Sequence, residues 1–209
     1  MQSFWNERYT AEEAAYGKEP NAFLVEALSQ LKPKLGDGAT LLLPCDGEGR
    51  NAVWAAGADW QVSSFDYSEA GVQKSKRWAA EASVEVNGQV ADAMSFEPAA
   101  QADVVALIYA HMPADLRAAF HKRAAAWVRP GGYLVLEGFH PDQIRNNHPS
   151  GGPKSIDMLF TPAMLQEDFE DGAGLSIESL TALETTLAEG LFHRGPASVT
   201  QLIAHKPID

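Results

Sequence analysis

Residues 40–52 read TLLLPCDGEGRNA, a short apolar run followed by a glycine turn and the start of a helical pattern. An apolar run of this length, bounded by turn residues, is typical of a strand buried on both faces of a sheet. Gly47 and Gly49 let the backbone pass close to a ligand without a Cβ atom in the way. The helix start beyond them offers unpaired N–H groups that suit a carboxylate or phosphate. The stretch predicts a strand–loop–helix unit that binds a ligand, the alternative being a tight turn without one.

Strands and helices alternate through the rest of the chain. Strands are predicted over 61–66, 84–90, 102–109 and 133–138, and helices over 51–58, 68–82 and 113–128. This alternation predicts a parallel sheet with helices on both faces, an α/β doubly wound fold. Two longer strands near the C-terminus, 175–187 and 197–205, predict an antiparallel hairpin.

The two segments that flank this core have other patterns. Residues 4–31 predict a helical extension with a turn near 17–21, whereas 139–162 predict a long loop before a helix at 163–169. A loop of this length is often a lid or a binding segment.

Composition excludes several classes of function. The chain has 209 residues, of which 45% are hydrophobic and 21% charged, as expected for one globular domain. A net charge of −12 argues against binding to nucleic acid or to an anionic membrane. Its single cysteine, Cys45, cannot form an internal disulfide, and neither a signal peptide nor an apolar run of about 20 residues is visible. We expect a cytoplasmic protein.

Two acidic residues follow predicted strands at the same edge of the sheet. Asp66 ends the second strand, 17 residues after Gly49, where an acid accepts hydrogen bonds from ribose hydroxyls in nucleotide-binding sheets. Its alternative role is local, since a helix begins at Ser68. Asp92 follows the third strand and suits the exocyclic amine of adenine, the alternative being a solvated loop residue.

These features together resemble the class I S-adenosylmethionine-dependent methyltransferases. The resemblance rests on the glycine loop, on Asp66 and Asp92, and on the RPGG turn at 129–132 before the last parallel strand. The segments FWNERY at 4–9 and YGKEPN at 16–21 are similar to the small tellurite-resistance and thiopurine-type branch. The resemblance implies a Rossmann-like, seven-stranded sheet with its last strand antiparallel, and S-adenosylmethionine as cofactor with S-adenosylhomocysteine as product.

The resemblance also divides the chain and assigns residues to a site. It implies one domain over 1–209, with an N-terminal helical lid over 1–35, a cofactor-binding core over 36–138, an acceptor-side loop and helix over 139–170 and a hairpin over 171–209. Gly47 and Gly49 line the methionine part of the cofactor, Asp66 holds the ribose, and Asp92 with the Ala93 backbone holds the adenine. The full set of expected cofactor-binding residues is Cys45, Asp46, Gly47, Glu48, Gly49, Asn51, Asp66, Tyr67, Asp92, Ala93, Tyr109, Trp5 and Tyr9.

The sequence departs from this family at two positions. Leu43 stands where an acid inside the first strand usually helps to hold the ammonium group of the cofactor, and Cys45 stands where a glycine begins the loop. Asp46 is the expected substitute for the missing acid, and Glu48 a weaker one. We interpret Cys45 as a small residue packed beneath the loop rather than as a nucleophile, because no helper residue lies near it in sequence.

The acceptor side is expected to involve aromatic residues and histidines. Trp5, Tyr9 and Tyr16 either form a lid around the methyl sulfonium or pack an amphipathic helix on the sheet. His111 follows the fourth strand and is the candidate for a proton-accepting group. The expected substrate-side residues are Tyr16, His111, His140 and His148. Histidine spacing suited to a metal is absent, so we predict no metal.

We therefore predict methyl transfer to a small-molecule acceptor, such as a thiol or a metalloid oxyanion. A nicotinamide-dependent oxidoreductase is one alternative, because Gly47-x-Gly49-x-x-Ala52 with Asp66 also fits a dinucleotide site. A non-catalytic protein that binds S-adenosylmethionine is another, because of Leu43 and Cys45.

Overall fold

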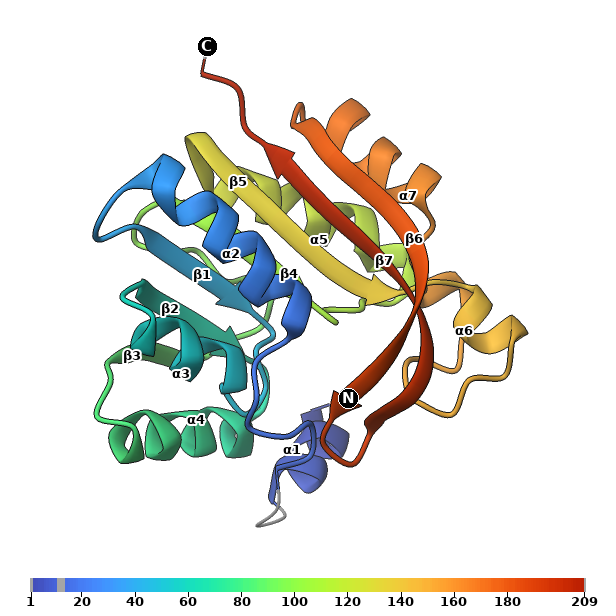
Figure 1. Cartoon of the computed structure of the whole chain (residues 1–209), viewed down its shortest axis with the longest axis horizontal. Coiled ribbons are helices and arrows are strands. Elements are labelled where there is room, and N and C mark those ends of the chain that lie inside the picture. Colours follow the sequence, from blue (N-terminus) through green and yellow to red (C-terminus); the bar gives the residue numbers. More distant parts are fainter. Residues whose placement is uncertain (1, 11–13, 209) are drawn as a thin grey trace.

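The computed structural model describes residues 2–10 and 14–208 of the chain. Its strands form a seven-stranded sheet in the order β3-β2-β1-β4-β5-β7-β6 (Figure 1). The strands are β1 (Thr40–Pro44), β2 (Gln61–Asp66), β3 (Val86–Val90), β4 (Ala102–Ile108), β5 (Val128–Phe139), β6 (Ser176–Glu189) and β7 (His193–His205). The α-helices are α1 (Gln2–Thr10), α2 (Ala22–Leu35), α3 (Arg50–Gly57), α4 (Glu69–Glu81), α5 (Ala114–Trp127), α6 (Asp142–Arg145) and α7 (Pro162–Gln166). A 3-10 turn (Ile156–Met158) precedes α7 and a π-helical turn (Glu167–Asp171) follows it.

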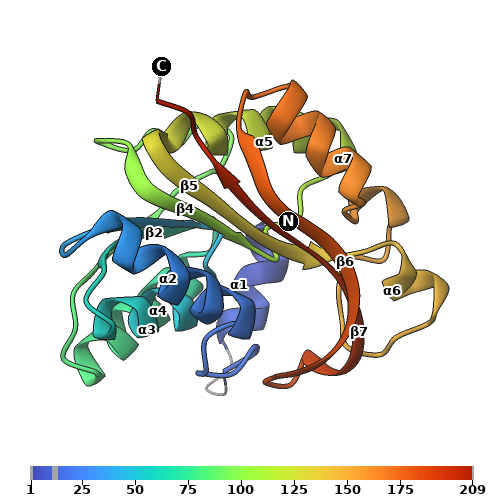
Figure 2. The same ribbon diagram turned by 45° about the horizontal axis from the view of Figure 1, so that its top comes forward.

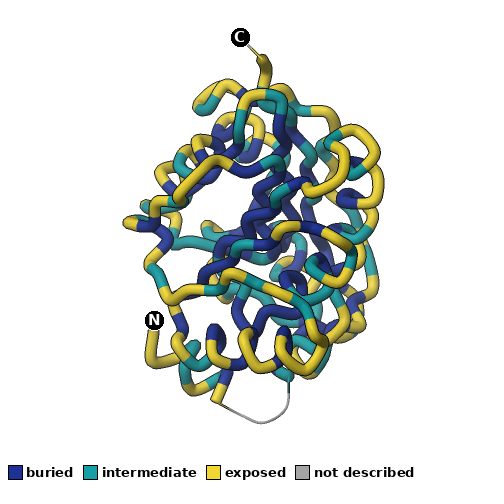
Figure 3. Tube along the Cα trace, turned by 90° about the vertical axis from the view of Figure 1, so that its left-hand side faces the viewer, coloured by how far each residue is buried: buried dark blue, intermediate teal, exposed yellow. Residues whose placement is uncertain are grey.

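Helices cover both faces of the sheet. Because successive side chains of a strand point to opposite faces, Leu41 and Leu43 pack with α2 and α3, while Leu42 packs with α5 and α7. Figure 2 shows these two helical layers on either side of the strands, and Figure 3 shows the buried residues running through the middle of the molecule. The predicted doubly wound α/β fold with a C-terminal antiparallel hairpin is confirmed.

The strand order reverses beside β1. Strand β1 pairs in parallel with β2 on one side and with β4 on the other. The chain therefore extends the sheet first to one side of β1, through β2 and β3, and then to the other side, from β4 onward. In open α/β sheets, a crevice forms outside the carboxyl ends of the strands at such a switch point, and ligands bind there.

The hairpin of β6 and β7 extends beyond the sheet and curves toward α1 (Figure 1). At its tip, the backbone N–H groups of Leu191 and Phe192 donate to the carbonyl of Ala15, over 3.1 and 3.3 Å. A Cβ atom on Gly190 would lie 2.1 Å from the nitrogen of Gly17, so only glycine allows this approach. The N-terminal segment and the hairpin tip therefore meet, although they are far apart in the sequence.

Three local predictions differ from the structure. The segment Arg129–Gly132 ends α5 as expected but lies within β5 as an irregular stretch, where Gly131 has a φ of +75° and the register with β4 jumps from Ala102↔Val128 to Val104↔Tyr133. Gly131 donates to the Lys206 carbonyl, and Arg129 pairs with Asp103. The predicted loop after β5 contains α6. The hairpin turn is shorter than expected, since Arg194 is already part of β7.

Candidate functional site

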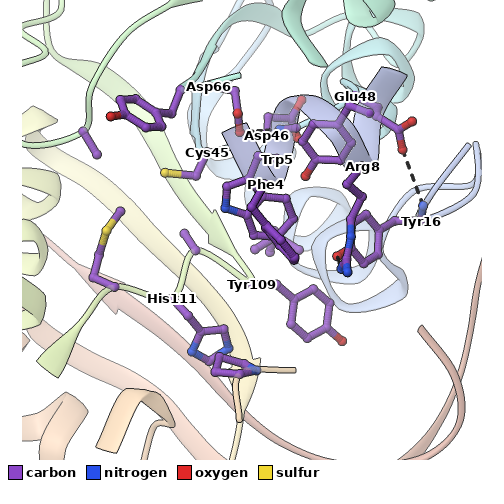
Figure 4. Close-up of a pocket in the computed structure, with 18 of the residues that line it drawn as sticks. Phe4, Trp5, Arg8, Tyr16, Cys45, Asp46, Glu48, Asp66, Tyr109 and His111 are labelled. Atoms are coloured by element: carbon purple, nitrogen blue, oxygen red, sulfur yellow. Dashed lines mark hydrogen bonds between the residues drawn. The ribbon is translucent and has the colours of Figure 1, made fainter. Parts of the chain in front are cut away.

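A cavity of about 790 Å³ lies at the carboxyl ends of β1, β2 and β4, between α1, the loop after β1 and the hairpin (Figure 4). It brings together most of the residues expected from sequence. Those that line it are Trp5, Tyr9, Tyr16, Cys45, Asp46, Gly47, Glu48, Asn51, Asp66, Tyr67, Asp92, Ala93, Tyr109 and His111. Gly49, His140 and His148 do not line it.

Asp66 ties the glycine loop to the end of β2. One carboxylate oxygen accepts a 2.8 Å hydrogen bond from the Gly47 backbone N–H, and the other accepts one of 2.8 Å from Ser68. The residue is buried and also lines the cavity. Because a carboxylate oxygen can accept more than one hydrogen bond, Asp66 can hold the loop and still accept from a ligand. The two roles considered for Asp66 are therefore compatible.

Cys45 has the backbone conformation expected of the glycine that usually begins this loop in the family that the sequence resembles. Its φ angle is +57°, in the left-handed region that residues other than glycine and asparagine rarely adopt. The loop thus keeps its path at a local cost in strain. Burial raises the pKa of the Cys45 thiol well above its ordinary value, so the group stays protonated and is a poor nucleophile.

Asp46 is partly buried and lines the cavity from the loop between β1 and α3. Its carboxylate accepts a hydrogen bond of 3.3 Å from the backbone N–H of Ala52 and another from the Asn51 side chain. Burial nevertheless raises the pKa of Asp46 to about 7. A carboxyl group that costs this much to ionise is suited to pairing with a cation, which would favour the charged form.

Glu48, the weaker substitute for the missing acid, is already engaged. It accepts a 2.8 Å hydrogen bond from the Ala15 backbone N–H and pairs with Lys74 of α4 over 2.7 Å, with both charged side chains buried. A longer contact to the Tyr16 N–H, of 3.5 Å, is the dashed line in Figure 4. Glu48 therefore fastens the N-terminal segment to the core, which leaves Asp46 as the acid of the loop that has no cationic partner in an ion pair among the described residues.

Aromatic rings form the wall opposite the loop. Trp5 stacks on Tyr9 with ring centroids 5.5 Å apart, and Tyr16 lies 6.5 Å from Trp5. Arg8 donates to the Tyr16 hydroxyl over 2.9 Å and lies 4.2 Å from the ring centroid of Phe192 in the hairpin turn. The N-terminal aromatics pack against one another and also line the cavity, and a lid around the methyl sulfonium stays a prediction.

The geometry of His111 does not favour the expected proton-accepting role. The backbone N–H of Phe139 donates to Nε2 over 3.0 Å, and Nδ1 lies 2.8 Å from the carbonyl of Met158. A backbone N–H can only donate and a carbonyl can only accept, so Nδ1 carries the proton and neither nitrogen is free. Burial also lowers the pKa of His111 to about 4. The ring stacks on Phe160 and joins β5 to the segment before α7.

The other expected histidines lie away from the cavity. His140 accepts a hydrogen bond from the backbone of Asp142, and His148 pairs with Glu184 over 2.7 Å. The long loop places the two rings at the side of the sheet where α6 and the hairpin meet it. Gly49 is also outside, because it packs against Ser75 of α4.

Sequence reasoning missed a buried polar network beside the aromatic wall. The Asn21 side chain donates to Glu137 over 2.6 Å and to Glu189 over 3.0 Å, and Arg50 donates to Glu189 over 2.8 Å. His193 contacts Glu189 and lines the cavity. These residues come from segments up to 168 positions apart, so no local spacing reveals them. The one available signal is Glu137, a charge within the apolar run YLVLEG.

Comparisons with known proteins agree with this geometry. The family model described as "Methyltransferase domain" matches residues 43–132. No curated protein matches the sequence. Several solved structures have the same fold. One, from work on the conversion of a disulfide bond into a thioacetal group during echinomycin biosynthesis, is 17% identical with a TM-score of 0.75, over 98% of this chain and 89% of the other.

Two further structures are similar over nearly the whole chain. TehB from Haemophilus influenzae is 14% identical with a TM-score of 0.69, over 98% of this chain and 66% of TehB. Magnesium protoporphyrin IX methyltransferase ChlM from Synechocystis PCC 6803, with bound S-adenosylhomocysteine, is 15% identical with a TM-score of 0.72, over 98% and 97% of the two chains.

The class of protein follows from the match and the fold taken together. Residues 43–132 match the methyltransferase-domain family model, and the chain has the fold of the class I S-adenosylmethionine-dependent methyltransferases. The predicted resemblance to this class is confirmed, and S-adenosylmethionine is the cofactor of the class, with S-adenosylhomocysteine as product.

Proposed function

We propose that this protein transfers a methyl group from S-adenosylmethionine to a small-molecule acceptor. The observation that carries the proposal is a single cavity with one part suited to the cofactor and another part suited to the acceptor. Acidic groups and a glycine loop line one part of it, and aromatic rings line the other. A volume of about 790 Å³ lies in the range of cavities that bind cofactors and small ligands.

The residues of the first part suit the groups of the cofactor. Asp66 retains capacity to accept hydrogen bonds from ribose hydroxyls, and Asp92 lies nearby with Ala93 for the adenine. Asp46, whose raised pKa makes it costly to ionise, suits the ammonium group. When bound, the cofactor supplies the electrophilic methyl group and its leaving group. The chain orients the two reactants and excludes water, the latter through the aromatic wall.

The nature of the acceptor rests on weaker support. A thiol or a metalloid oxyanion is the acceptor class expected from the resemblance to the tellurite-resistance branch, which the fold of TehB supports loosely. The residues at the far end of the cavity favour a different class. No helix among the described residues is long and apolar enough to cross a membrane. A cytoplasmic location and independence from nucleic acid remain predictions from composition.

Calorimetric titration with three ligands tests the proposal. We expect purified protein to bind S-adenosylmethionine and S-adenosylhomocysteine, and not NADH. Binding of NADH alone would support the oxidoreductase alternative. If none binds to protein shown to be folded, the site is not a cofactor site. Binding of both sulfur nucleotides without turnover on a panel of thiols, oxyanions and phenols would support the non-catalytic alternative.

The pH dependence of cofactor binding tests the role of Asp46. The ammonium group of the cofactor pairs with the carboxylate form of Asp46. Below the Asp46 pKa of about 7, the carboxyl group must therefore lose its proton before it can pair. The affinity for S-adenosylhomocysteine should rise roughly tenfold per pH unit up to about pH 7 and level off above it. Calorimetry between pH 5.5 and 8 is the measurement.

The matched variant for this experiment is Asp46→Asn. It should bind more weakly at pH 8 and lose the slope below pH 7, because the amide does not titrate. A slope that persists in the variant would assign the proton to another group. In the free protein, Asp46 stays protonated at pH values where the unfolded chain has already lost this proton. Its contribution to the free energy of unfolding is therefore fully present below about pH 4 and is lost as the pH rises through 7.

A further inference from the structure

Glu189 and His193 form a hydrogen-bonded pair at the end of the hairpin. Nδ1 of His193 lies 3.2 Å from a carboxylate oxygen of Glu189, across the turn that joins β6 to β7. Both side chains are buried, with 10% and 7% of their surfaces exposed. Since the carboxylate accepts, Nδ1 carries the proton, and the lone pair of the neutral ring is on Nε2.

Glu189 is held in place from three directions. Arg50 donates to the same oxygen that His193 contacts, over 2.8 Å, and Asn21 donates to the other oxygen over 3.0 Å. Burial raises the pKa of Glu189, but the His193 and Arg50 contacts outweigh it, so the pKa lies below its ordinary value. The carboxylate is thus ionised and fixed, as is typical of a group that orients a catalytic imidazole.

His193 faces the cavity among aromatic rings. Its ring centroid lies 4.5 Å from that of Tyr16, 4.5 Å from that of Tyr109 and 5.2 Å from that of Phe139. Of the two histidines that line the cavity, His111 uses both nitrogens for backbone contacts, whereas Nε2 of His193 has no hydrogen-bond partner among the described residues. Burial lowers the pKa of His193, so the ring is neutral at pH 7.

We propose that His193, oriented by Glu189, is the general base of the reaction, and that the acceptor is a hydroxyl group on a planar ring. The inference rests on the proposed function. As the acceptor oxygen forms its bond to the methyl carbon, the bond from that carbon to sulfur breaks and sulfur keeps the electron pair. The hydroxyl proton passes to Nε2 of His193, whose positive charge Glu189 stabilises, and then leaves to water.

Two observations favour this acceptor over a soft anion. A thiolate or a metalloid oxyanion reacts without losing a proton, so it has no use for an oriented, neutral imidazole. The rings of Tyr16, Tyr109 and Phe139 also offer flat apolar surfaces, against which a planar ring packs well. The pair of Glu189 and His193 explains why a buried, charged network is built at this end of the cavity.

The test uses nitrogen NMR with 4-methylphenol, a phenol that keeps its proton at neutral pH, as the probe. Protein labelled with ¹⁵N in its six histidines is loaded with S-adenosylhomocysteine and titrated with the probe. We expect the Nε2 signal of His193 to be that of an unprotonated nitrogen and to move toward the protonated position when the probe binds. His193→Gln, whose amide can still donate to Glu189, assigns the signal.

Turnover of the probe with S-adenosylmethionine gives a second readout. In His193→Gln, kcat should fall about 100-fold or more while KM changes little, because the lost step is proton removal. Glu189→Gln, which keeps an acceptor for Nδ1 but no charge, should lose less. His205→Gln, at the far end of β7, is the matched control and should behave as the unmodified protein.

The outcomes separate the two proposals. Failure of S-adenosylhomocysteine to bind overturns the proposed function. If S-adenosylhomocysteine binds normally, any one of three results overturns the role of His193 and leaves the proposed function standing. These are a probe that does not bind, an Nε2 signal that the probe does not move, and unchanged turnover in a folded His193→Gln protein. If His193→Gln does not fold, Glu189→Gln serves to assign the signal, and the spectrum of the unmodified protein decides.

Discussion

Replacing Gly49 by alanine is expected to destabilise the protein by about 3 kcal/mol or more. A Cβ atom at this position would lie 2.0 Å from Oγ, 2.4 Å from Cβ and 2.9 Å from Cα of Ser75 in α4. The last of these contacts is with backbone, which cannot move away as a flexible side chain does. The φ angle of +85° adds strain for any residue with a Cβ atom. Overpacking and a left-handed backbone each cost about 1–3 kcal/mol. Urea denaturation measures the change.

Helix α3, which begins directly after Gly49, supplies a matched control. Gly57 ends α3, its φ is not positive, and the nearest atom to an added Cβ is a Val84 methyl group at 4.0 Å. Gly57→Ala should therefore leave stability unchanged or slightly raise it. Adding Ser75→Gly to Gly49→Ala should recover part of the loss, because it removes the side-chain clash but not the strain. Equal stability of Gly49→Ala and Gly57→Ala would contradict the packing role of Gly49.

Replacing Asp66 by alanine is expected to weaken the binding of S-adenosylhomocysteine about 100-fold. The substitution removes the group proposed to hold the ribose, and it also leaves the Gly47 and Ser68 N–H groups without their acceptor. Each hydrogen bond to a charged group is worth about 1.5–3 kcal/mol, and about 1.4 kcal/mol corresponds to a factor of ten in affinity. Isothermal titration calorimetry is the measurement.

Two variants separate the contact with the cofactor from the support of the loop. Asp66→Asn keeps one acceptor oxygen and should retain part of the affinity. Asp37→Ala removes an exposed acid in the turn before β1 and should bind as the unmodified protein does. Unchanged affinity in Asp66→Ala would show that the cofactor does not use this residue, and it would contradict the assignment of Asp66 to the ribose.

Much of the proposed cofactor side of the cavity was predictable because it is local. Asp66 is the last residue of β2, and Asp46, Gly47 and Asp92 lie within three residues of the end of a strand; the carboxyl ends of parallel strands meet at one edge. Knowledge of the strands was therefore enough to bring these residues together. The replacement of glycine by cysteine at position 45 did not change this, because Cys45 adopts the φ angle that the loop requires.

The errors fall where local pattern and tertiary contact disagree. The RPGG segment has the composition of a turn, but contacts with Asp103 and Lys206 hold it within β5 as an irregular stretch between β4 and β7. His111 is in the expected place at the end of β4. Its role was misjudged, because the backbone groups that occupy its two nitrogens belong to Phe139 and Met158, which no spacing connects to it.

The order of the elements, the doubly wound sheet and the acidic edge of the cavity were determined by the sequence itself. Alternating apolar periods and turn residues act over short stretches of chain, and these are visible without coordinates. The acceptor end was decided only by the tertiary structure. It joins Asn21, Arg50, Glu189 and His193, and their proximity depends on the curved hairpin reaching the N-terminal segment. Contacts between such distant segments leave no periodic trace in the sequence, because any residue types that pack and pair there would satisfy the same local pattern.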